Sequence, residues 1–154
     1  MIKRVVVGVA VLVLAAVVIA PLTSAAGDAK GETLRLIDVG APIDVFLSGG
    51  DPSHTGDREV FRDTLVWAAD RSAAGKAEGY CTVIEPSTAT TTCTIVTTLK
   101  RGTLTTEGVG VFVPGTTSTA AVTGGTGSYE AATGHATFVF NPGGDSAVTF
   151  TLLR

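Results

Sequence analysis

The sequence has few of the residues from which most active sites are built. Of its 154 residues only two are cysteine and two are histidine, and 16% are charged. His54 and His135 are far apart in the chain, and neither stands at metal-ligand spacing from other ligand-type residues. No Walker loop, HExxH, CxxC or nucleophile-elbow motif is present. These absences argue against a metal centre and against the commonest phosphate-binding and hydrolase motifs.

Positive charge is also scarce. The chain has 11 lysine and arginine residues against 14 aspartate and glutamate residues, for a net charge of −3. Two of the basic residues, Lys3 and Arg4, lie in a segment that we expect to be removed. No basic patch alternates with aromatic residues. The composition therefore argues against nucleic acid or an anionic membrane surface as the partner.

Helical periodicity is missing beyond the first 26 residues, where threonine, valine, alanine and glycine dominate. Short β-type runs recur between turn signals, a pattern typical of a sandwich or barrel. Eight antiparallel strands can close without free edges around one small ligand. We therefore predict an all-β, eight-stranded antiparallel barrel with strands at 33–39, 58–67, 77–85, 91–100, 103–113, 118–123, 135–140 and 146–153, and a short strand or buried loop anchor at 44–47.

The one long apolar run is at the start of the chain. Lys3 and Arg4 precede the run Val5 to Ala20, Pro21 breaks it, and Ser24 to Ala26 offers small residues for cleavage. This pattern predicts a signal peptide over 1–26, a linker over 27–32 and a single domain over 33–154. The alternative is an uncleaved anchor, although the run is short for a spanning helix. Cleavage predicts a secreted protein without stable membrane association.

Cys81 and Cys93 are the only cysteines, on consecutive predicted strands. They share the alternation phase of Val83 and Ile95, so they can face each other across the hairpin. In an exported protein a disulfide is the default, and the alternative is a free thiol inside the barrel.

Three glycines in four residues, Gly124, Gly125 and Gly127, follow the strand-like run at 120–122. Such clusters mark a place where the backbone needs positive φ or approaches another segment closely. The expected structure is a hairpin corner. Without a following lysine and helix, it is not a phosphate-binding loop.

Asp63 is the charged residue most clearly placed inside a strand pattern. Phe61, Asp63, Leu65 and Trp67 share one phase, so Asp63 points inward if the aromatic residues do. Burial disfavours the ionised form of an unpaired carboxylate, which makes Asp63 a candidate general acid or base. The alternative is a paired or solvent-facing Asp63.

Three other residues are candidates near the cavity. Glu59 shares the phase of Asp63 and lies nearer a barrel mouth. Tyr80 and Tyr129 are candidate hydrogen-bond donors to a ligand, and packing is their alternative role.

Several blocks, taken in order, resemble the allene oxide cyclase-like barrel superfamily, which includes allene oxide cyclases and dirigent proteins. The resemblance covers about residues 56 to 154. Its most recognisable segment is the glycine-rich one, Ala121 to Gly134. The other blocks are Gly56-Asp57, the aromatic-x-Asp of Phe61-Arg62-Asp63, the Gly-x-Cys strand Gly79 to Ile84, Gly102-Thr103-Leu104 with Gly108, and the closing Val148 to Leu152.

The resemblance implies a barrel with an apolar cavity that works without metal or organic cofactor, often as a trimer, so a homotrimer or homodimer is expected. Allene oxide cyclases close a ring in an unsaturated epoxy fatty acid, and dirigent proteins steer the coupling of phenoxy radicals. Asp63 matches an acidic dirigent position, and Cys81 matches a cavity cysteine of the cyclases. Thr133 stands where dirigent proteins usually carry arginine.

Two functions fit these features. The first is an exported, cofactor-free cyclase or isomerase that folds a small apolar substrate in a dry pocket, with Asp63 as the acid and Tyr80 or Tyr129 assisting. The second is a non-catalytic barrel that binds a ligand or guides a stereoselective coupling.

Overall fold

A computed structural model describes residues 31–40, 43–46 and 54–153. The predicted signal peptide and most of the predicted linker lie outside these residues. Within them, no helix is long and apolar enough to cross a membrane. The regular elements are β1 (Glu32–Asp38), β2 (Ile43–Phe46), β3 (Arg58–Trp67), β4 (Ala73–Glu85), η1 (Pro86–Thr88), β5 (Thr90–Leu99), β6 (Gly102–Val111), β7 (Thr117–Gly125), η2 (Gly127–Tyr129), β8 (Thr133–Phe140) and β9 (Ser146–Leu153).

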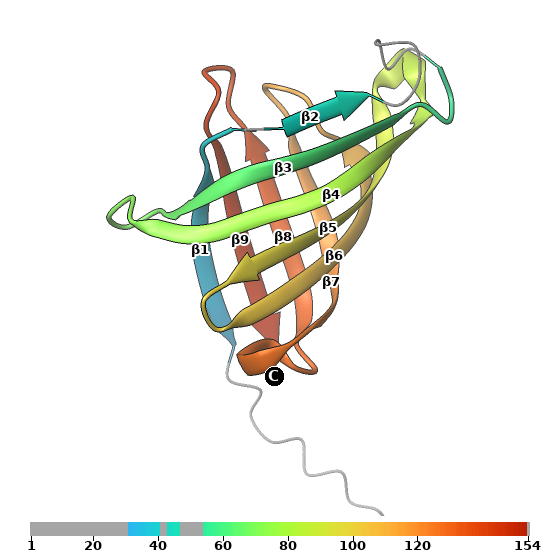
Figure 1. Cartoon of the computed structure of the whole chain (residues 1–154). Helices are drawn as coiled ribbons and strands as arrows, with labels where there is room; N and C mark the ends of the chain where they lie inside the picture. Colours follow the sequence, from blue (N-terminus) through green and yellow to red (C-terminus); the bar gives the residue numbers. More distant parts are fainter. Residues whose placement is uncertain (1–30, 41–42, 47–53, 154) are drawn as a thin grey trace, which may run out of the picture.

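The strands form one antiparallel sheet in the order β1-β9-β8-β7-β6-β5-β4-β3-β2, and a further pairing of β1 with β3 closes it into a barrel (Figure 1). β3 has room for both partners because they use different parts of it. β1 pairs with its carboxyl end at 65–67, and β2 pairs with 59–62. The closed barrel therefore has eight strands, and β2 is a short addition outside it. The predicted eight-stranded antiparallel barrel is confirmed.

The predicted strand boundaries are close to those observed, with two informative differences. β4 begins at Ala73, four residues before the predicted start of this strand at residue 77. Its inward residue Gly75 lies against the backbone of Thr98, where a side chain would clash, so glycine here allows close strand packing instead of a turn. β7 continues to Gly125, so two of the three clustered glycines lie in the strand.

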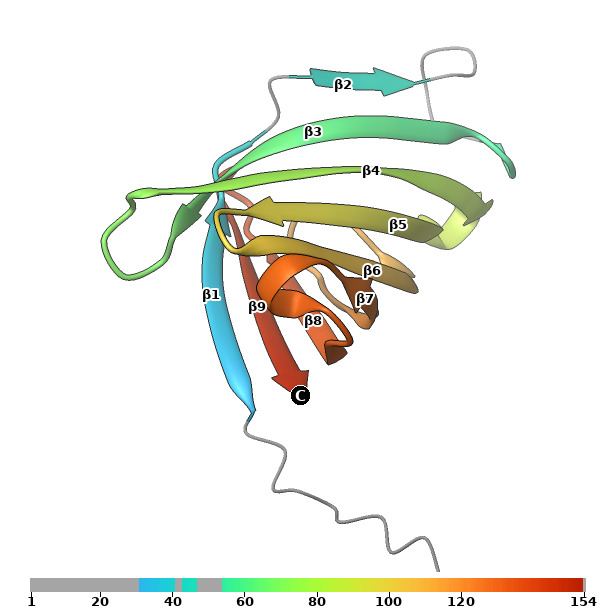
Figure 2. The ribbon, with the colours of Figure 1, turned by 60° about the horizontal axis from the view of Figure 1, so that its bottom comes forward.

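The connection after β7 is a 3-10 turn at one end of the barrel. Gly127 has a φ of +62°, which glycine adopts without steric cost. A side chain on Gly125 would come within 2.6 Å of the Thr103 carbonyl oxygen, so this glycine meets the need for close approach. The turn lies across one end of the barrel (Figure 2), and its residue Tyr129 is 1% exposed. The predicted hairpin corner is therefore a longer connection between β7 and β8, and it covers one end of the barrel.

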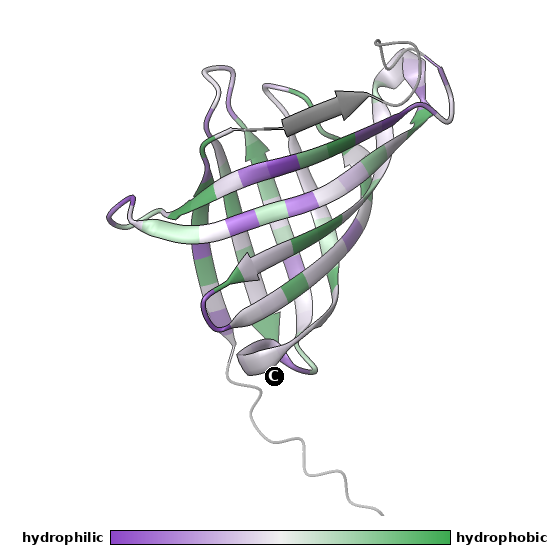
Figure 3. Ribbon diagram, viewed as in Figure 1, coloured by the Kyte–Doolittle hydropathy of each residue, from purple (hydrophilic) through white to green (hydrophobic). Residues whose placement is uncertain are grey.

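Alternation along the strands separates the apolar interior from the polar exterior, as the banding in Figure 3 shows. The largest fully buried side chains, with less than 2% exposure, are Leu36, Leu65, Leu104, Tyr129, Phe150 and Leu152, together with Thr106.

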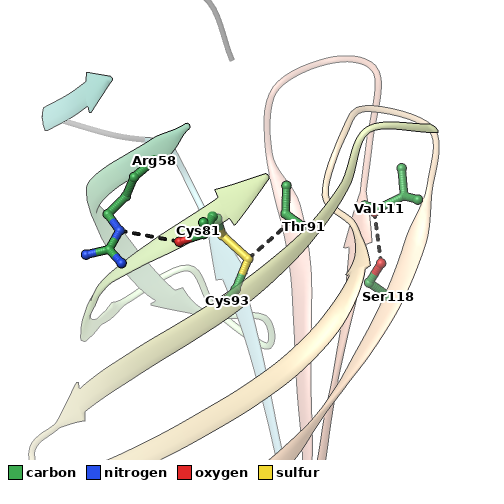
Figure 4. The surroundings of a disulfide bond; sticks show 7 residues. Arg58, Cys81, Thr91, Cys93, Val111 and Ser118 are labelled. Carbon is green, nitrogen blue, oxygen red and sulfur yellow. Dashed lines mark hydrogen bonds between the residues drawn. A yellow bond between two sulfur atoms is a disulfide. The ribbon is translucent and has the colours of Figure 1, made fainter. Parts of the chain in front are cut away.

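The two cysteines form a disulfide between directly paired positions of β4 and β5 (Figure 4). Cys93 is 3% exposed, and its sulfur lies 3.6 Å from the Thr91 hydroxyl. The predicted disulfide is confirmed, and the alternative of a free thiol is wrong. A cross-link of this kind is typical of exported proteins.

We expect the Cys81→Ser/Cys93→Ser double variant to lose about 3 kcal/mol of unfolding free energy, because the cross-link restricts a loop of about a dozen residues in the unfolded chain. Urea denaturation followed by circular dichroism measures this loss. A reductant should lower the stability of the native protein to that of the variant and leave the variant unchanged. A native protein whose stability is insensitive to reductant would contradict the expectation.

Candidate functional site

A cavity of about 230 Å³ lies inside the barrel, toward the end opposite η2. Most of its wall is apolar, and five of its side chains carry the polar chemistry. The polar side chains are Asp38, Glu59, Asp63, Thr97 and Ser146, and the apolar ones are Phe61, Leu65, Ala77, Cys81, Ile95, Phe112, Phe138, Phe140 and Val148. An apolar pocket with a few convergent polar groups is the usual form of a small-molecule site.

The cavity exists because the inner face of β4 carries small side chains. Its inward positions run Gly75, Ala77, Gly79, and each is paired with a larger residue of β3. A side chain on Gly79 would come within 3.0 Å of the Ile95 Cα and 3.2 Å of the Phe61 ring, so glycine allows β4 to pack closely against both. The space left beside Ala77 is open to the centre of the barrel.

Asp63 lies on this wall, as its alternation phase predicted. It is half-buried on β3, between Phe61 and Leu65 on the same inner face. Across the sheet it is opposite Ala77, and Ala77 is opposite Thr97 of β5. The carboxyl and the hydroxyl therefore share one row of the barrel, with only a methyl group between them. A carboxyl group facing an apolar cavity can donate or accept a proton at a bound ligand.

Two further carboxyl groups reach the cavity. Glu59 lies four residues before Asp63 on the same face of β3. Asp38 ends β1 opposite Leu65, so it is the diagonal neighbour of Asp63, with Cβ atoms roughly 7 Å apart by the usual spacing of such pairs. One Asp38 carboxylate oxygen accepts a hydrogen bond of 2.9 Å from the Gly40 N–H.

Asp38 was missed by the sequence interpretation, although a signal for it existed. Leu34 and Leu36 stand two residues apart in the predicted strand at 33–39, so they share one face, and extending this alternation by two residues reaches Asp38. The register confirms this, because Leu36 and Asp38 are opposite Val148 and Ser146 on β9, and both of these line the cavity.

Three phenyl rings form a cluster on the wall across the barrel from β3 and β4. Phe112 lies 6.0 Å from Phe138 and 5.5 Å from Phe140 between ring centroids, and the latter contact is edge-to-face. Phe138 and Phe140 are 6.3 Å apart and nearly parallel. These rings give the cavity a rigid aromatic wall.

The two tyrosines predicted to assist Asp63 do not line this cavity. Tyr80 lies on the outer face of β4, 38% exposed, and the Arg58 guanidinium stacks over its ring at 4.5 Å. Tyr129 is buried at the end closed by η2, with Arg101 5.4 Å from its ring centroid. The structure therefore brings Asp63 together with Asp38 and Glu59, and it does not bring either tyrosine to them.

A second, smaller cavity of about 100 Å³ continues the first toward the 3-10 turn η1. Glu59, Cys81 and Phe112 line both cavities. The disulfide thus stands in the wall between two spaces. Because Cys81 is oxidised, it offers no thiol to a ligand here.

Two carboxylates on the outer surface have lowered pKa values. Hydrogen bonds from Lys76 and Arg62 hold the pKa of Glu78 below its ordinary value. Hydrogen bonds from Ser87 lower the pKa of Glu85 in the same way. Among the described residues, no group of three histidine, cysteine or acidic side chains is arranged to hold a metal ion.

No protein-family model and no curated protein matches this chain. Several solved structures do. One titled pyocyanin demethylase is 26% identical, with a TM-score of 0.68, over 79% of this chain and 99% of that one. A pterocarpan synthase dirigent protein is 20% identical, with a TM-score of 0.66, over 87% of this chain and 92% of that one. An exo-specific intermolecular Diels-Alderase is 18% identical, with a TM-score of 0.68, over 83% and 100%.

These similarities extend over most of each chain. The chain is therefore a barrel of the allene oxide cyclase-like and dirigent-like fold, which confirms the resemblance seen in its sequence.

Proposed function

We propose that this protein binds a small, largely apolar organic molecule in the barrel cavity and promotes its cyclisation or isomerisation without a cofactor. The observation that carries this proposal is the position of Asp63, on the wall of a largely apolar cavity. In such a cavity a ligand is held in one folded shape, and a proton can be exchanged at a fixed point.

The dirigent proteins and the Diels-Alderase among the structural neighbours support a function in coupling or ring closure. These neighbours also support the alternative, a barrel that only binds a ligand and guides a coupling reaction. The pyocyanin demethylase adds a third chemistry, the removal of a methyl group. Export through the signal peptide at 1–26 is part of the proposal, and the disulfide supports it.

Within this proposal Asp63 protonates or orients an oxygen of the substrate, while the phenyl wall excludes water. Asp38 can contact the same ligand, because it is the diagonal neighbour of Asp63 and lines the same cavity. Roles for Tyr80 and Tyr129 stay a prediction from sequence, and their positions favour packing. A homotrimer or homodimer also stays a prediction.

We expect the neutral fluorophore N-phenyl-1-naphthylamine to bind in the cavity, with enhanced emission in its apolar surroundings. Ala77→Leu should weaken this binding at least about tenfold, because the larger side chain fills the space beside Asp63. Fluorescence titration measures both affinities, and circular dichroism checks the fold. The matched control is Thr92→Leu on the outer face of the neighbouring strand, which should bind like the native protein. Equal binding by the Ala77→Leu variant would place the probe elsewhere.

We expect Asp63→Asn to lower turnover about 100-fold or more, because the amide cannot exchange a proton. Affinity for N-phenyl-1-naphthylamine should change less than about threefold, since the two side chains have the same shape. The assay incubates the protein with small-molecule extracts of culture medium and follows compounds by liquid chromatography with mass detection.

Cyclisation or isomerisation changes the retention time of a compound and leaves its mass unchanged. Such a conversion by the native protein and by a Glu107→Gln control, absent from Asp63→Asn, is the expected result. Undiminished conversion by Asp63→Asn would show that the acid role is wrong. Loss of a methyl group from the compound would favour demethylation over ring closure.

A further inference from the structure

Alternation along β3 separates the charges of this strand by sign. The sequence Arg58-Glu59 and Arg62-Asp63 places both carboxylates on the inner face and both guanidinium groups on the outer face. Arg58 stacks on Tyr80 outside the barrel, and Arg62 bonds Glu78 at 2.6 Å. The bases of this strand are therefore engaged on the opposite side of the wall from the cavity.

The cavity consequently holds three acidic side chains and no basic one. Asp38, Glu59 and Asp63 all line it, and none of its described lining residues is lysine, arginine or histidine. In an apolar space the electrostatic interaction of carboxylates with a ligand is stronger than in water. The cavity therefore attracts positive charge and repels negative charge.

The aromatic wall adds a second attraction for the same kind of ligand. The faces of aromatic rings carry negative partial charge and attract cations, most strongly where water is excluded. Phe112, Phe138 and Phe140 form such a wall, and Phe140 lies in one row with Asp38, separated from it only by Ser146. An apolar ring body bearing a positive charge would thus meet a carboxylate and a ring face together.

Thr97 adds a polar contact point on the same wall. It lines the cavity and lies opposite Ala77, which is itself opposite Asp63. A polar ligand atom beside Ala77 would meet the Thr97 hydroxyl.

We propose that the molecule bound in this cavity is an organic cation, with an apolar ring body and its positive charge between Asp38 and Asp63. This inference rests on the proposed function, since it assumes that the cavity is the binding site. Suitable chemistries are an N-alkylated aromatic heterocycle, an iminium ion or a substituted ammonium ion.

The test compares three probes that share a two-ring body and differ in charge: 1-methylquinolinium, 1-methylnaphthalene and 1-naphthoate. Equilibrium dialysis gives their dissociation constants for the native protein and for the Asp38→Asn, Asp63→Asn and Glu107→Gln variants. Glu107 is exposed on β6 and serves as the control for a general loss of negative charge. Thermal unfolding confirms that each variant is folded.

The cation is expected to bind at least about tenfold more tightly than the neutral probe, and the anion more weakly than both. Asp38→Asn and Asp63→Asn should each reduce the preference for the cation several-fold, and Glu107→Gln should leave it unchanged. Equal affinity for the cation and the neutral probe would overturn this inference and leave the proposed function standing. Failure of all three probes to bind would count against the proposed function itself. A cation preference of undiminished size in the Asp38→Asn/Asp63→Asn double variant would also overturn the inference, because the inference places the charge between these two carboxyl groups.

Discussion

The pairing of β1 with the carboxyl end of β3 is the constraint on which the rest of this barrel depends. This pairing closes the barrel, and it consists of only three residue pairs: Leu36 with Trp67, Ile37 with Val66 and Asp38 with Leu65. Because side chains alternate between faces, a slip of one residue would turn every inward side chain of β3 outward. The same register sets which end of the barrel is packed and which end holds the carboxylates.

The cavity follows from an imbalance of side-chain size around this closed sheet. Near η2, large side chains such as Leu104, Phe150 and Leu152 fill the interior. Farther along, the inward residues Ala77 and Gly79 of β4 are too small to meet the phenyl rings on the opposite wall. Well-packed interiors leave few voids larger than a water molecule, so a cavity of about 230 Å³ is a feature that packing alone would not keep.

Much of this could be predicted from the sequence, because strands impose a period of two on their residues. That period located Asp63 on the inner face and placed Cys81 opposite Cys93. It would also have located Asp38, had the alternation of Leu34 and Leu36 been followed to the end of the strand.

Other features depend on contacts between distant segments. Tyr80 follows Gly79 on the outer phase of its strand, and its stacking under Arg58 needs the register of β3 on β4. Tyr129 is buried because η2 folds back beneath the barrel, and no local pattern specifies that turn. The start of β4 was obscured because Gly75 has a low strand propensity, and only its close approach to Thr98 explains its place there.

A crystal structure of the protein with bound N-phenyl-1-naphthylamine tests the central claim most directly, since it shows where an apolar molecule binds. The account predicts the probe inside the barrel, in contact with Phe138 and within reach of the Asp63 carboxyl and the Thr97 hydroxyl. The contradicting result is an empty cavity with the probe on the outer surface, for example in the shallow groove beside Trp67 and Arg35.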